Sequence, residues 1–396
     1  MNISIDATGL SPNKTGTVTY LVEILGQWNL DRAVGHEFVI FCTPATRHHF
    51  DEIGLDGRFH LVMAPSSKLA QMIWQQTALP LFLVHHKIAV HWGPGFVLPL
   101  WGGCPMVVTI HDMTFDLFPE VHEPIKRFYF PFMIRRAVKR AVRVLAISQA
   151  TADDLDHLIP GIASKTVVTH LAARTLGLSP NPFLNDEHSS NLDIAWRSRE
   201  DPSKSNEAHE PNPSIKYQTE PYALFIGTLE PRKNLERLLQ AWKQLPQEIR
   251  GEHRLIVVGV KGWMVDQLQA EGNDSIEFVG HVSDQALQSF LSGASCFVYP
   301  SLYEGFGLPV IEAMAAGVPV LTSNVGATSE IAKDAALLVD PLSIDEIVSG
   351  LRRLLTDSDL RLQLSEAGLK RAGEFSWART ARLTLEALSF SGSKAR

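Results

Sequence analysis

Cysteines are few in this sequence, and none of them lies at a spacing that could bind a metal. The 396 residues include only Cys42, Cys104 and Cys296, which are scattered among apolar neighbours. Zinc sites need cysteines or histidines that are paired closely in sequence. The three cysteines therefore predict reduced, buried thiols, which are typical of a cytosolic protein.

Long apolar runs and a secretory signal are also lacking. No apolar run approaches the roughly 20 residues that a membrane-spanning helix needs. Residues Met1–Asp6 have neither the basic nor the apolar region of a signal peptide. We expect a cytoplasmic protein, at most peripheral on the inner face of the cytoplasmic membrane.

Positive charge is not in excess, and the glycine pattern of dinucleotide-binding enzymes is missing. The 36 Lys and Arg residues are outnumbered by 43 Asp and Glu residues, which gives a net charge of −7 and argues against nucleic acid as a partner. A dehydrogenase would carry G-x-G-x-x-G after its first strand, whereas Gly9 and Gly16 do not give that spacing. The composition is that of a globular protein, with 45% apolar and 20% charged residues.

Short apolar runs alternate with amphipathic stretches along the chain, which predicts an α/β protein with parallel sheets. The length of 396 residues exceeds what one hydrophobic core usually supports, so we expect two domains. Residues 179–220 are rich in Ser, Asn, Pro and charge, which predicts a linker or surface insertion between domains at 1–178 and 221–375. Strands are expected at Ile3–Ile5, Phe38–Phe41, Val107–Ile110, Val142–Ile147, Val167–Thr169, Tyr222–Gly227, Leu255–Gly259, Ile276–Val279, Cys296–Tyr299 and Val318–Thr322.

The end of the chain has the period of helices. Ser343 is the expected N-cap of a long amphipathic stretch that runs to Leu364. A final helical segment is expected from Trp377 to Leu388, within a last part of the chain at 376–396.

Two glutamates stand eight positions apart around a glycine-rich turn. Phe297–Pro300 reads as the end of a buried strand, so Glu304 lies on the loop at its carboxyl end and Glu312 in the first turn of the next helix. Open parallel sheets bind ligands at that edge, and two carboxylates there can accept hydrogen bonds from the vicinal hydroxyls of a sugar or a ribose. The alternative is that Glu312 only complements the helix N-terminus and that Glu304 is solvated.

Two basic residues open the second half of the chain. A strand ends at Gly227, and a helix begins near Asn234, whose side chain is a suitable N-cap. Arg232 and Lys233 then lie at a helix N-terminus, where fixed positive charge and free backbone donors suit a diphosphate. A solvated basic pair on a surface turn is the alternative.

The first half supplies a histidine at the end of a strand. Thr109 and Ile110 deliver His111 and Asp112 to the carboxyl edge of the expected sheet. A hydrogen-bonded structural histidine is the alternative to a role at a site. A second histidine, His281, lies after another expected strand, and there we favour an exposed loop position, with Ser283 capping the next helix.

Residues Pro124–Arg143 contain seven basic side chains and no acidic one, with Phe128, Tyr129, Phe130 and Phe132 among them. This stretch predicts either contact with anionic lipid head groups or a helix whose aromatic face packs in the core while its basic face is solvated. The second interpretation is slightly favoured.

The block Ser301–Glu312 resembles the E-x7-E signature of the glycosyltransferase family 4 enzymes of the GT-B fold, and the flanks Ala313–Val320 and Asp334–Pro341 resemble theirs as well. The resemblance implies two Rossmann-like domains that face one another across a cleft. It also implies an acceptor-binding domain at 1–178, a nucleotide-sugar domain at 221–375, and a C-terminal helix, beginning near Phe375–Trp377, that crosses back to the N-terminal domain.

The resemblance implies roles for individual residues. Arg232 and Lys233 would hold the diphosphate, Glu304 would orient the sugar, and His111 would reach a sugar hydroxyl. Relatives commonly have a second glycine where Val18 stands, which puts the first-loop contacts of Gly16 in question. The implied substrate-binding positions are Gly16, Asp112, Gly227, Val282, Gly305, Phe306, Gly307, Leu308 and Glu312.

The combination of His111–Phe115 with Glu230–Asn234 looks most like bacterial mannosyltransferases of O-antigen-like surface polysaccharides. This predicts transfer of mannose from GDP-mannose, with retention, to a glycan or lipid-linked acceptor. No cofactor and no metal are expected. UDP-glucose or UDP-N-acetylglucosamine are the alternative donors, and a sugar-nucleotide epimerase or a non-catalytic carbohydrate-binding protein are the alternative classes.

Overall fold

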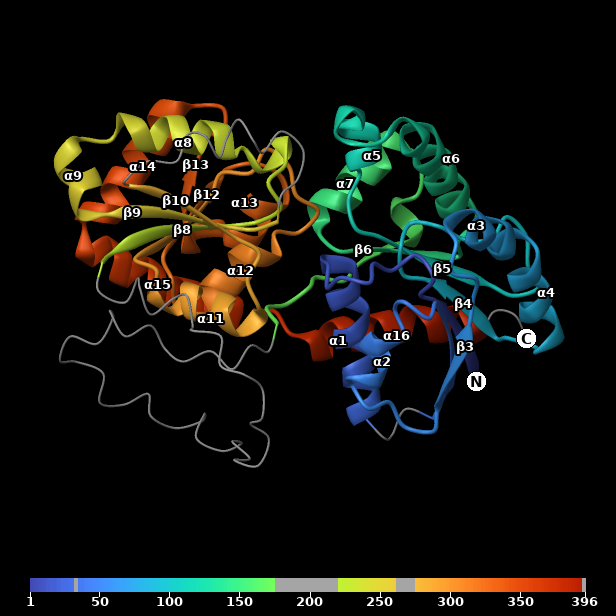
Figure 1. Cartoon of the computed structure of the whole chain (residues 1–396). Coiled ribbons are helices and arrows are strands. Elements are labelled where there is room, and N and C mark those ends of the chain that lie inside the picture. Colours follow the sequence, from blue (N-terminus) through green and yellow to red (C-terminus); the bar gives the residue numbers. More distant parts are fainter. Residues whose placement is uncertain (32–34, 175–219, 261–274, 394–396) are drawn as a thin grey trace. The chain divides into compact units, whose positions relative to one another are not determined.

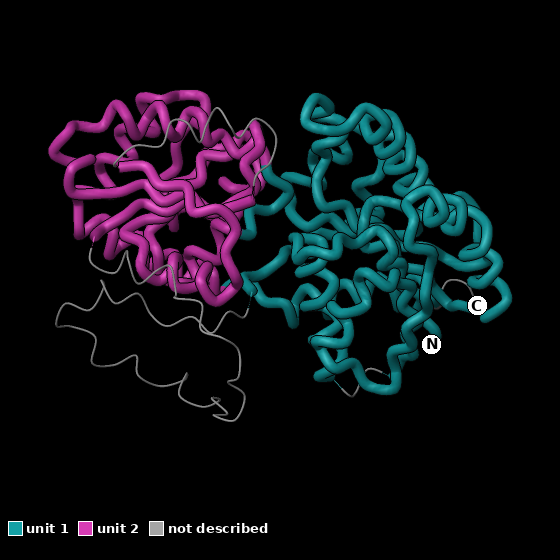
Figure 2. The backbone as a smooth tube through the Cα atoms, viewed as in Figure 1, with its two compact units in different colours: residues 1–174, 304–308, 374–396 teal, residues 175–303, 309–373 magenta. Residues whose placement is uncertain are grey.

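The computed structural model describes residues 1–31, 35–174, 220–260 and 275–393. The chain divides into two compact units. Unit 1 comprises residues 1–174, 304–308 and 374–396, and unit 2 comprises residues 175–303 and 309–373 (Figure 2). The predicted insertion at 179–220 lies almost entirely outside the described residues.

Unit 1 contains a parallel sheet whose strand order, over the described residues, is β3-β2-β1-β4-β5-β6-β7. The inner strand β5 is a nearly continuous apolar run that is buried on both faces, because helices cover both sides of the sheet. The bounds are β1 Asn2–Asp6, β2 Glu37–Cys42, β3 Phe59–Met63, β4 Val90–Gly93, β5 Met106–Ile110, β6 Arg143–Ala146 and β7 Thr166–Val168.

Helices cover the two faces of this sheet (Figure 1). One apolar core lies between the sheet and α3, α4, α6 and α7, and includes Leu83, Ile134 and Leu155. Helices α1 and α16 pack together on the other face. The bounds are α1 Gly16–Leu30, α2 His48–Asp51, α3 Lys68–Gln76, α4 Ala78–His85, α5 Thr114–Leu117, α6 Pro124–Arg140, α7 Gln149–Leu158 and α16 Trp377–Ser393.

The C-terminal helix α16 belongs to unit 1, as the family resemblance implied. Its Trp377 indole donates a hydrogen bond to Ala173 O at 3.0 Å, and the Trp28 indole of α1 donates to Ala381 O at 3.0 Å. Thr380 also donates to His170 O. Helix α16 therefore completes the core of the first unit from the far end of the chain.

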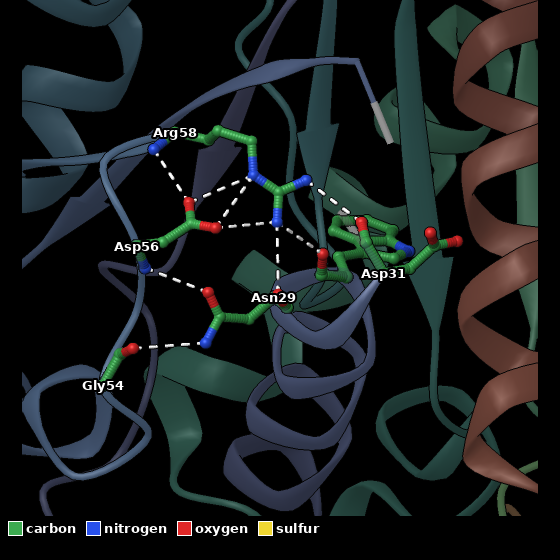
Figure 3. A network of polar contacts seen from close by, with 6 residues as sticks. Asn29, Asp31, Gly54, Asp56 and Arg58 are labelled. Carbon is green, nitrogen blue, oxygen red and sulfur yellow. Dashed lines mark hydrogen bonds and ion pairs between the residues drawn. The ribbon is translucent and has the colours of Figure 1, made fainter. Parts of the chain in front are cut away.

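Arg58 closes the C-terminal end of α1 (Figure 3). Its guanidinium donates to the carbonyls of Trp28 at 3.0 Å and Asp31 at 3.1 Å. Asp56 holds the guanidinium through both carboxylate oxygens, at 2.9 to 3.1 Å. The last carbonyls of a helix have no partner within the helix, so this arginine satisfies groups at the end of α1 that would otherwise need water.

Unit 2 is a second parallel sheet, with the order β10-β9-β8-β11-β12-β13 over the described residues. Its strands are β8 Tyr222–Ile226, β9 Arg254–Val258, β10 Ile276–Gly280, β11 Cys296–Tyr299, β12 Val320–Ser323 and β13 Leu337–Val339. Its helices are α8 Leu235–Gln244, α9 Gln247–Glu252, α11 Asp284–Gly293, α12 Leu308–Ala315, α13 Gly326–Ala332, α14 Ile344–Thr356 and α15 Ser358–Ala372.

The predicted fold class is confirmed, because each unit is a parallel, Rossmann-like α/β sheet. The ten expected strands are present with ends shifted by one or two residues, and Ser283 and Ser343 cap their helices through their side chains. The amphipathic stretch expected from Ser343 to Leu364 is confirmed as helical, but it is interrupted once. It is two helices, α14 and α15, because Asp357 ends the first and caps the second by accepting from Leu360 N at 2.9 Å.

No helix in the described part of the chain is both long enough and apolar enough to cross a bilayer.

A buried histidine in β4 makes the stability of unit 1 sensitive to acid. His91 is fully buried, and its Nδ1 lies 2.8 Å from Ser4 Oγ. Burial lowers the pKa of the ring to about 3, from 6.5 in the unfolded chain. Between these values only the unfolded state binds the proton, so the free energy of unfolding falls as the pH falls from about 6.5 towards 3, by at most about 1.4 kcal/mol per pH unit.

We expect this slope to be reduced in His91→Gln, which cannot titrate. The measurement is urea unfolding of both proteins between neutral and mildly acidic pH, comparing slopes because the variant itself lowers stability at every pH. Parallel curves for the two proteins would show that His91 is not the source of the acid sensitivity.

Candidate functional site

The cationic turn of unit 2 contains a buried lysine. Arg232 and Lys233 lie in the short 3-10 helix Pro231–Lys233 after β8. Lys233 is only 7% exposed, its Nζ donates to the Tyr299 hydroxyl at 2.8 Å, and it lies 5.3 Å from the centre of that ring. A buried ammonium group is costly unless it has partners. The interpretation of Lys233 as a solvated surface residue is therefore wrong.

Arg232 joins the cationic turn to the loop that follows β11. Its guanidinium pairs with Glu230 at 2.7 Å and donates to Tyr303 O at 3.2 Å. Its own carbonyl accepts from Leu302 N at 2.8 Å and from the Ser301 hydroxyl at 2.9 Å. Unit 2 thus holds both predicted cations against residues 299–303, directly before Glu304.

The predicted cap by Asn234 is wrong, although α8 does begin at the next residue. Asn234 has a left-handed backbone with φ of 60°, whereas side-chain caps need an extended N-cap residue. Its amide instead donates to Pro300 O at 2.9 Å and to Pro341 O at 2.6 Å. Asn234 therefore ties the cationic turn to two neighbouring loops of unit 2.

Glu312 lies one turn deeper in its helix than predicted. Helix α12 begins at Leu308, so Glu312 is in its second turn and not in its first. Gly307 has φ of 97°, which lets the helix begin directly after it. Charge–dipole effects fall off within the first turn, so a capping role explains Glu312 poorly. Its side chain is buried.

His111 follows β5 in unit 1 and is buried. Its Nε2 lies 2.7 Å from Pro94 O, and a carbonyl only accepts, so Nε2 carries the hydrogen and Nδ1 is the acceptor of the neutral ring. Burial lowers the pKa of the ring, against smaller opposing effects of Pro94 and Asp112. The edge of the Tyr20 ring packs on it, with the ring centres 5.0 Å apart. His111 is therefore held in one orientation, and burial disfavours its charged form.

The backbone of Gly305 lies directly against His111. A Cβ on Gly305 would stand 1.8 Å from His111 O and 3.0 Å from the Asp112 Cβ. The Gly305 carbonyl accepts from the hydroxyls of Ser148 at 2.6 Å and Thr151 at 3.0 Å. Unit 1 thus brings His111 together with the residue that follows Glu304, and Glu304 itself is buried.

The other predicted positions in unit 1 have local structural partners. Asp112 Oδ1 accepts from the backbone and hydroxyl of Thr114, at 3.0 and 2.6 Å, and so forms the turn into α5. Phe306 is buried, with its ring near those of His170 and Phe375.

Gly16 begins α1, and its Cβ position lies 3.7 Å from Leu308 Cδ1. Val18 is fully buried in the first turn of α1, and not in the loop before that helix, where the sequence had placed it.

The remaining predicted positions lie at the carboxyl edge of the sheet in unit 2. Gly227 follows β8, and a Cβ on Gly259 would stand 1.8 Å from Gly227 O. Gly259 is therefore a close-approach glycine, although it was not among the predicted site residues. Val282 is partly buried between β10 and α11, and the neighbouring His281 is exposed, as expected. Tyr299, the partner of Lys233, was also missed. Its position at the end of an apolar strand next to Pro300 was the available signal.

One hollow of unit 1 lies apart from the predicted site. A hollow of about 570 Å³ in unit 1 is lined by Gln149, Asp153 and His157 of α7 and by Thr166 of β7, and contains none of the predicted catalytic residues. Among the described residues, no group of three or more His, Cys, Asp or Glu side chains could hold a metal ion.

Comparisons with known proteins identify the family of each half of the chain. A family model described as "Glycosyltransferase Family 4" matches residues 16–172, and one described as "Glycosyl transferases group 1" matches residues 206–371. The O-antigen chain mannosyltransferase B of Escherichia coli is 33% identical over 307 residues, which is 76% of this chain and 74% of the relative. The O-antigen chain mannosyltransferase RfbU of Salmonella typhimurium is 23% identical over 85% of this chain and 86% of its own length.

Among solved structures, that of Anabaena HepE in complex with UDP-glucose has a TM-score of 0.74 at 17% identity. It covers 98% of this chain and 99% of its own. At that identity the likeness concerns the fold, which is the GT-B fold of glycosyltransferases. By its two family models, its sequence relatives and its two parallel sheets, the chain belongs to glycosyltransferase family 4.

Proposed function

We propose that the protein transfers mannose from GDP-mannose to a hydroxyl of a glycan acceptor, free or lipid-linked, in the synthesis of a bacterial surface polysaccharide. The relatives named as O-antigen mannosyltransferases support the sugar and the process. The observation that carries the proposal is the buried ammonium of Lys233, held with Arg232 against the loop that precedes Glu304.

In this mechanism the residues divide the work of binding and charge stabilisation. Arg232 and Lys233 hold the diphosphate and stabilise the negative charge that develops on it as the bond to the sugar breaks. Glu304 orients the sugar ring, and Glu312 accepts hydrogen bonds from the ribose. His111 Nδ1, the acceptor nitrogen of its ring, takes a hydrogen bond from a sugar hydroxyl.

The reaction proceeds with retention in this proposal. The bond between the anomeric carbon and the diphosphate oxygen breaks, and the acceptor oxygen bonds to the same face of that carbon. The acceptor proton passes to the departing diphosphate. The two cations take the place of a metal ion, so transfer should survive EDTA. A loss of activity in EDTA that Mn²⁺ restores would contradict this part.

A UDP-sugar is the second candidate donor, because HepE, a close structural match, was solved with UDP-glucose. The two donors share the diphosphate and differ in the base, so the cationic turn suits both equally.

A thermal-shift panel of GDP, GDP-mannose, UDP, UDP-glucose and NAD tests the proposal. A ligand that binds only the folded protein stabilises it by about 2.7 kcal/mol at a hundred times its Kd, so we expect GDP and GDP-mannose to raise the Tm by several degrees. A rise with the uridine nucleotides alone would transfer the proposal to a UDP-sugar. A rise with NAD alone would contradict it. Incubation with labelled GDP-mannose and lipid extract, followed by assignment of the anomeric configuration, tests the transfer itself.

A further inference from the structure

Helix α6 presents one outward stripe that is apolar in its first half and basic in its second. Ile125 and Phe128 are each 81% exposed and Phe132 is 51% exposed. Arg136 and Lys139 continue the same stripe and are exposed as well. The spacing of three, four, four and three residues keeps these positions on one side of a helix. The opposite side, including Ile134 and Val138, is buried in the core of unit 1.

The aromatic residues of this segment therefore lie on two sides of α6, one buried and one exposed. Neither interpretation of the sequence predicted this. Phe130 stacks on Phe115, with ring centres 4.2 Å apart, and packs against the core. Phe128 and Phe132 lie on the exposed side with the basic residues. The favoured interpretation, an aromatic face in the core with a separate basic face in solvent, is therefore wrong for these two rings.

The basic residues in the second half of the stripe have no ion-pair partner among the described residues. Lys126 and Arg135, to either side, pair with Glu123 at 3.2 Å and Asp116 at 2.5 Å. Arg136 instead lies over the Phe132 ring, 5.2 Å from its centre. Within the described residues, no carboxylate lies within ion-pair distance of Arg136 or Lys139.

Helix α3 adds a second apolar side on the same face of the sheet. It contains no buried residue, and its Leu69, Met72 and Ile73 are exposed at helical spacing. Trp74 of α3 and Phe130 of α6 pack against the same core, so both helices belong to one layer over the sheet (Figure 1). Gln75 of α3 donates to Asp6 at the carboxyl end of β1, at 2.7 Å, and α6 packs against β5, the strand that His111 follows. Both helices thus flank the edge of the sheet where His111 lies.

We propose that this surface, the exposed sides of α3 and α6, binds an anionic lipid bilayer. The apolar side chains enter the boundary between head groups and acyl chains, while Arg136 and Lys139 meet the lipid phosphates. Exposed phenylalanine and isoleucine side chains suit the apolar acyl chains of a bilayer. The neighbouring basic residues, which have no ion-pair partner among the described residues, suit its anionic head groups. A bilayer bound here brings a lipid-linked acceptor towards the edge of the sheet that holds His111.

Vesicle co-sedimentation tests this proposal. The wild-type protein is expected to sediment with vesicles of phosphatidylcholine and phosphatidylglycerol at low salt, more weakly near 1 M salt, where charges are screened beyond about 3 Å, and least with phosphatidylcholine alone. Each basic residue near an anionic surface is worth about a fivefold change in partitioning. The double variant Arg136→Gln/Lys139→Gln should therefore lose about 25-fold at low salt.

The variant Ile125→Ser/Phe128→Ser/Phe132→Ser should lose binding at every salt concentration, since each buried apolar side chain contributes about tenfold or more. Leu342→Ser/Leu362→Ser, at exposed positions of unit 2, is the matched control and should bind like the wild type. The proposal is overturned if the wild-type protein stays in solution with anionic vesicles, which is the result expected if this surface binds a protein partner. The proposal is also overturned if the wild-type protein binds uncharged vesicles as strongly as anionic ones, or if the control variant loses as much binding as the α6 variants.

The proposal goes beyond sugar transfer and can fail independently of it. The thermal shift with GDP is measured for every variant. A variant that keeps that shift and loses vesicle binding separates the lipid surface from the donor site.

Discussion

Replacing Gly305 by alanine is expected to reduce transfer to the limit of detection while the secondary structure persists. The added Cβ would stand 1.8 Å from His111 O, 2.9 Å from His111 C and 3.0 Å from the Asp112 Cβ. The first two are backbone atoms that no side-chain rotation can move, so residues 304–308 or the end of β5 must shift by roughly 1 Å or more. A displacement of that size at a reacting group costs on the order of a hundredfold in rate, and here Glu304 and His111 are displaced together.

The measurement is kcat/KM with labelled donor, together with the Tm and the circular dichroism spectrum. Gly26→Ala is the matched control, because Gly26 lies within α1 with no atom within 4 Å of its Cβ position. This change should keep activity and stabilise the helix by up to about 1 kcal/mol. Normal activity in Gly305→Ala would mean that the segment need not rest on His111 for transfer.

Lys233→Met is expected to lower kcat by about 10²–10³-fold while leaving the Tm close to that of the wild type. The charge that stabilises the leaving diphosphate is lost, and removal of one such donor typically has this effect. Stability is expected to change little, because methionine has a similar volume and its burial does not carry the cost of burying an ammonium group. The methionine can occupy the same space against the Tyr299 ring.

Two further variants show which property of the lysine matters. Tyr299→Phe removes the hydroxyl that accepts from Nζ at 2.8 Å and keeps the ring, so it should lower kcat only several-fold. Lys233→Arg keeps the charge, but its larger planar group cannot occupy the same buried position, and we expect partial activity at best. Retention of activity by Lys233→Met would remove the cationic turn from the mechanism.

The fold was largely predictable because its strands are short, continuous apolar runs that end in glycine or a polar residue. β5 and β11 read directly from the sequence for this reason. β4 was missed because His91 interrupts its apolar pattern, and burial of a neutral histidine depends on Ser4 of a neighbouring strand, which sequence spacing does not reveal. The short edge strands β3 and β13 were missed as well.

The site was predictable as a set of residue types and less so as a geometry. The glutamates, cations and histidine were selected by their places at the ends of strands. The left-handed backbone of Asn234 and the extra turn before Glu312 were not, since both follow from contacts with loops distant in sequence. Membership of residues 304–308 in unit 1 rests on contacts such as that of Ser148 with Gly305, 157 positions apart, which no local pattern encodes.

The position of α16 determines when the protein can finish folding during its synthesis. The ribosome makes residues 1–174 before unit 2, yet the helix that covers one side of their sheet, and supplies the partner of the Trp28 indole, is made only after unit 2. Domains generally fold as units while the chain is being made, but the first unit here stays incomplete until α16, Trp377–Ser393, has left the exit tunnel. Nascent chains stalled before Trp377 should therefore be recognised by chaperones and proteases for longer than their length alone would suggest.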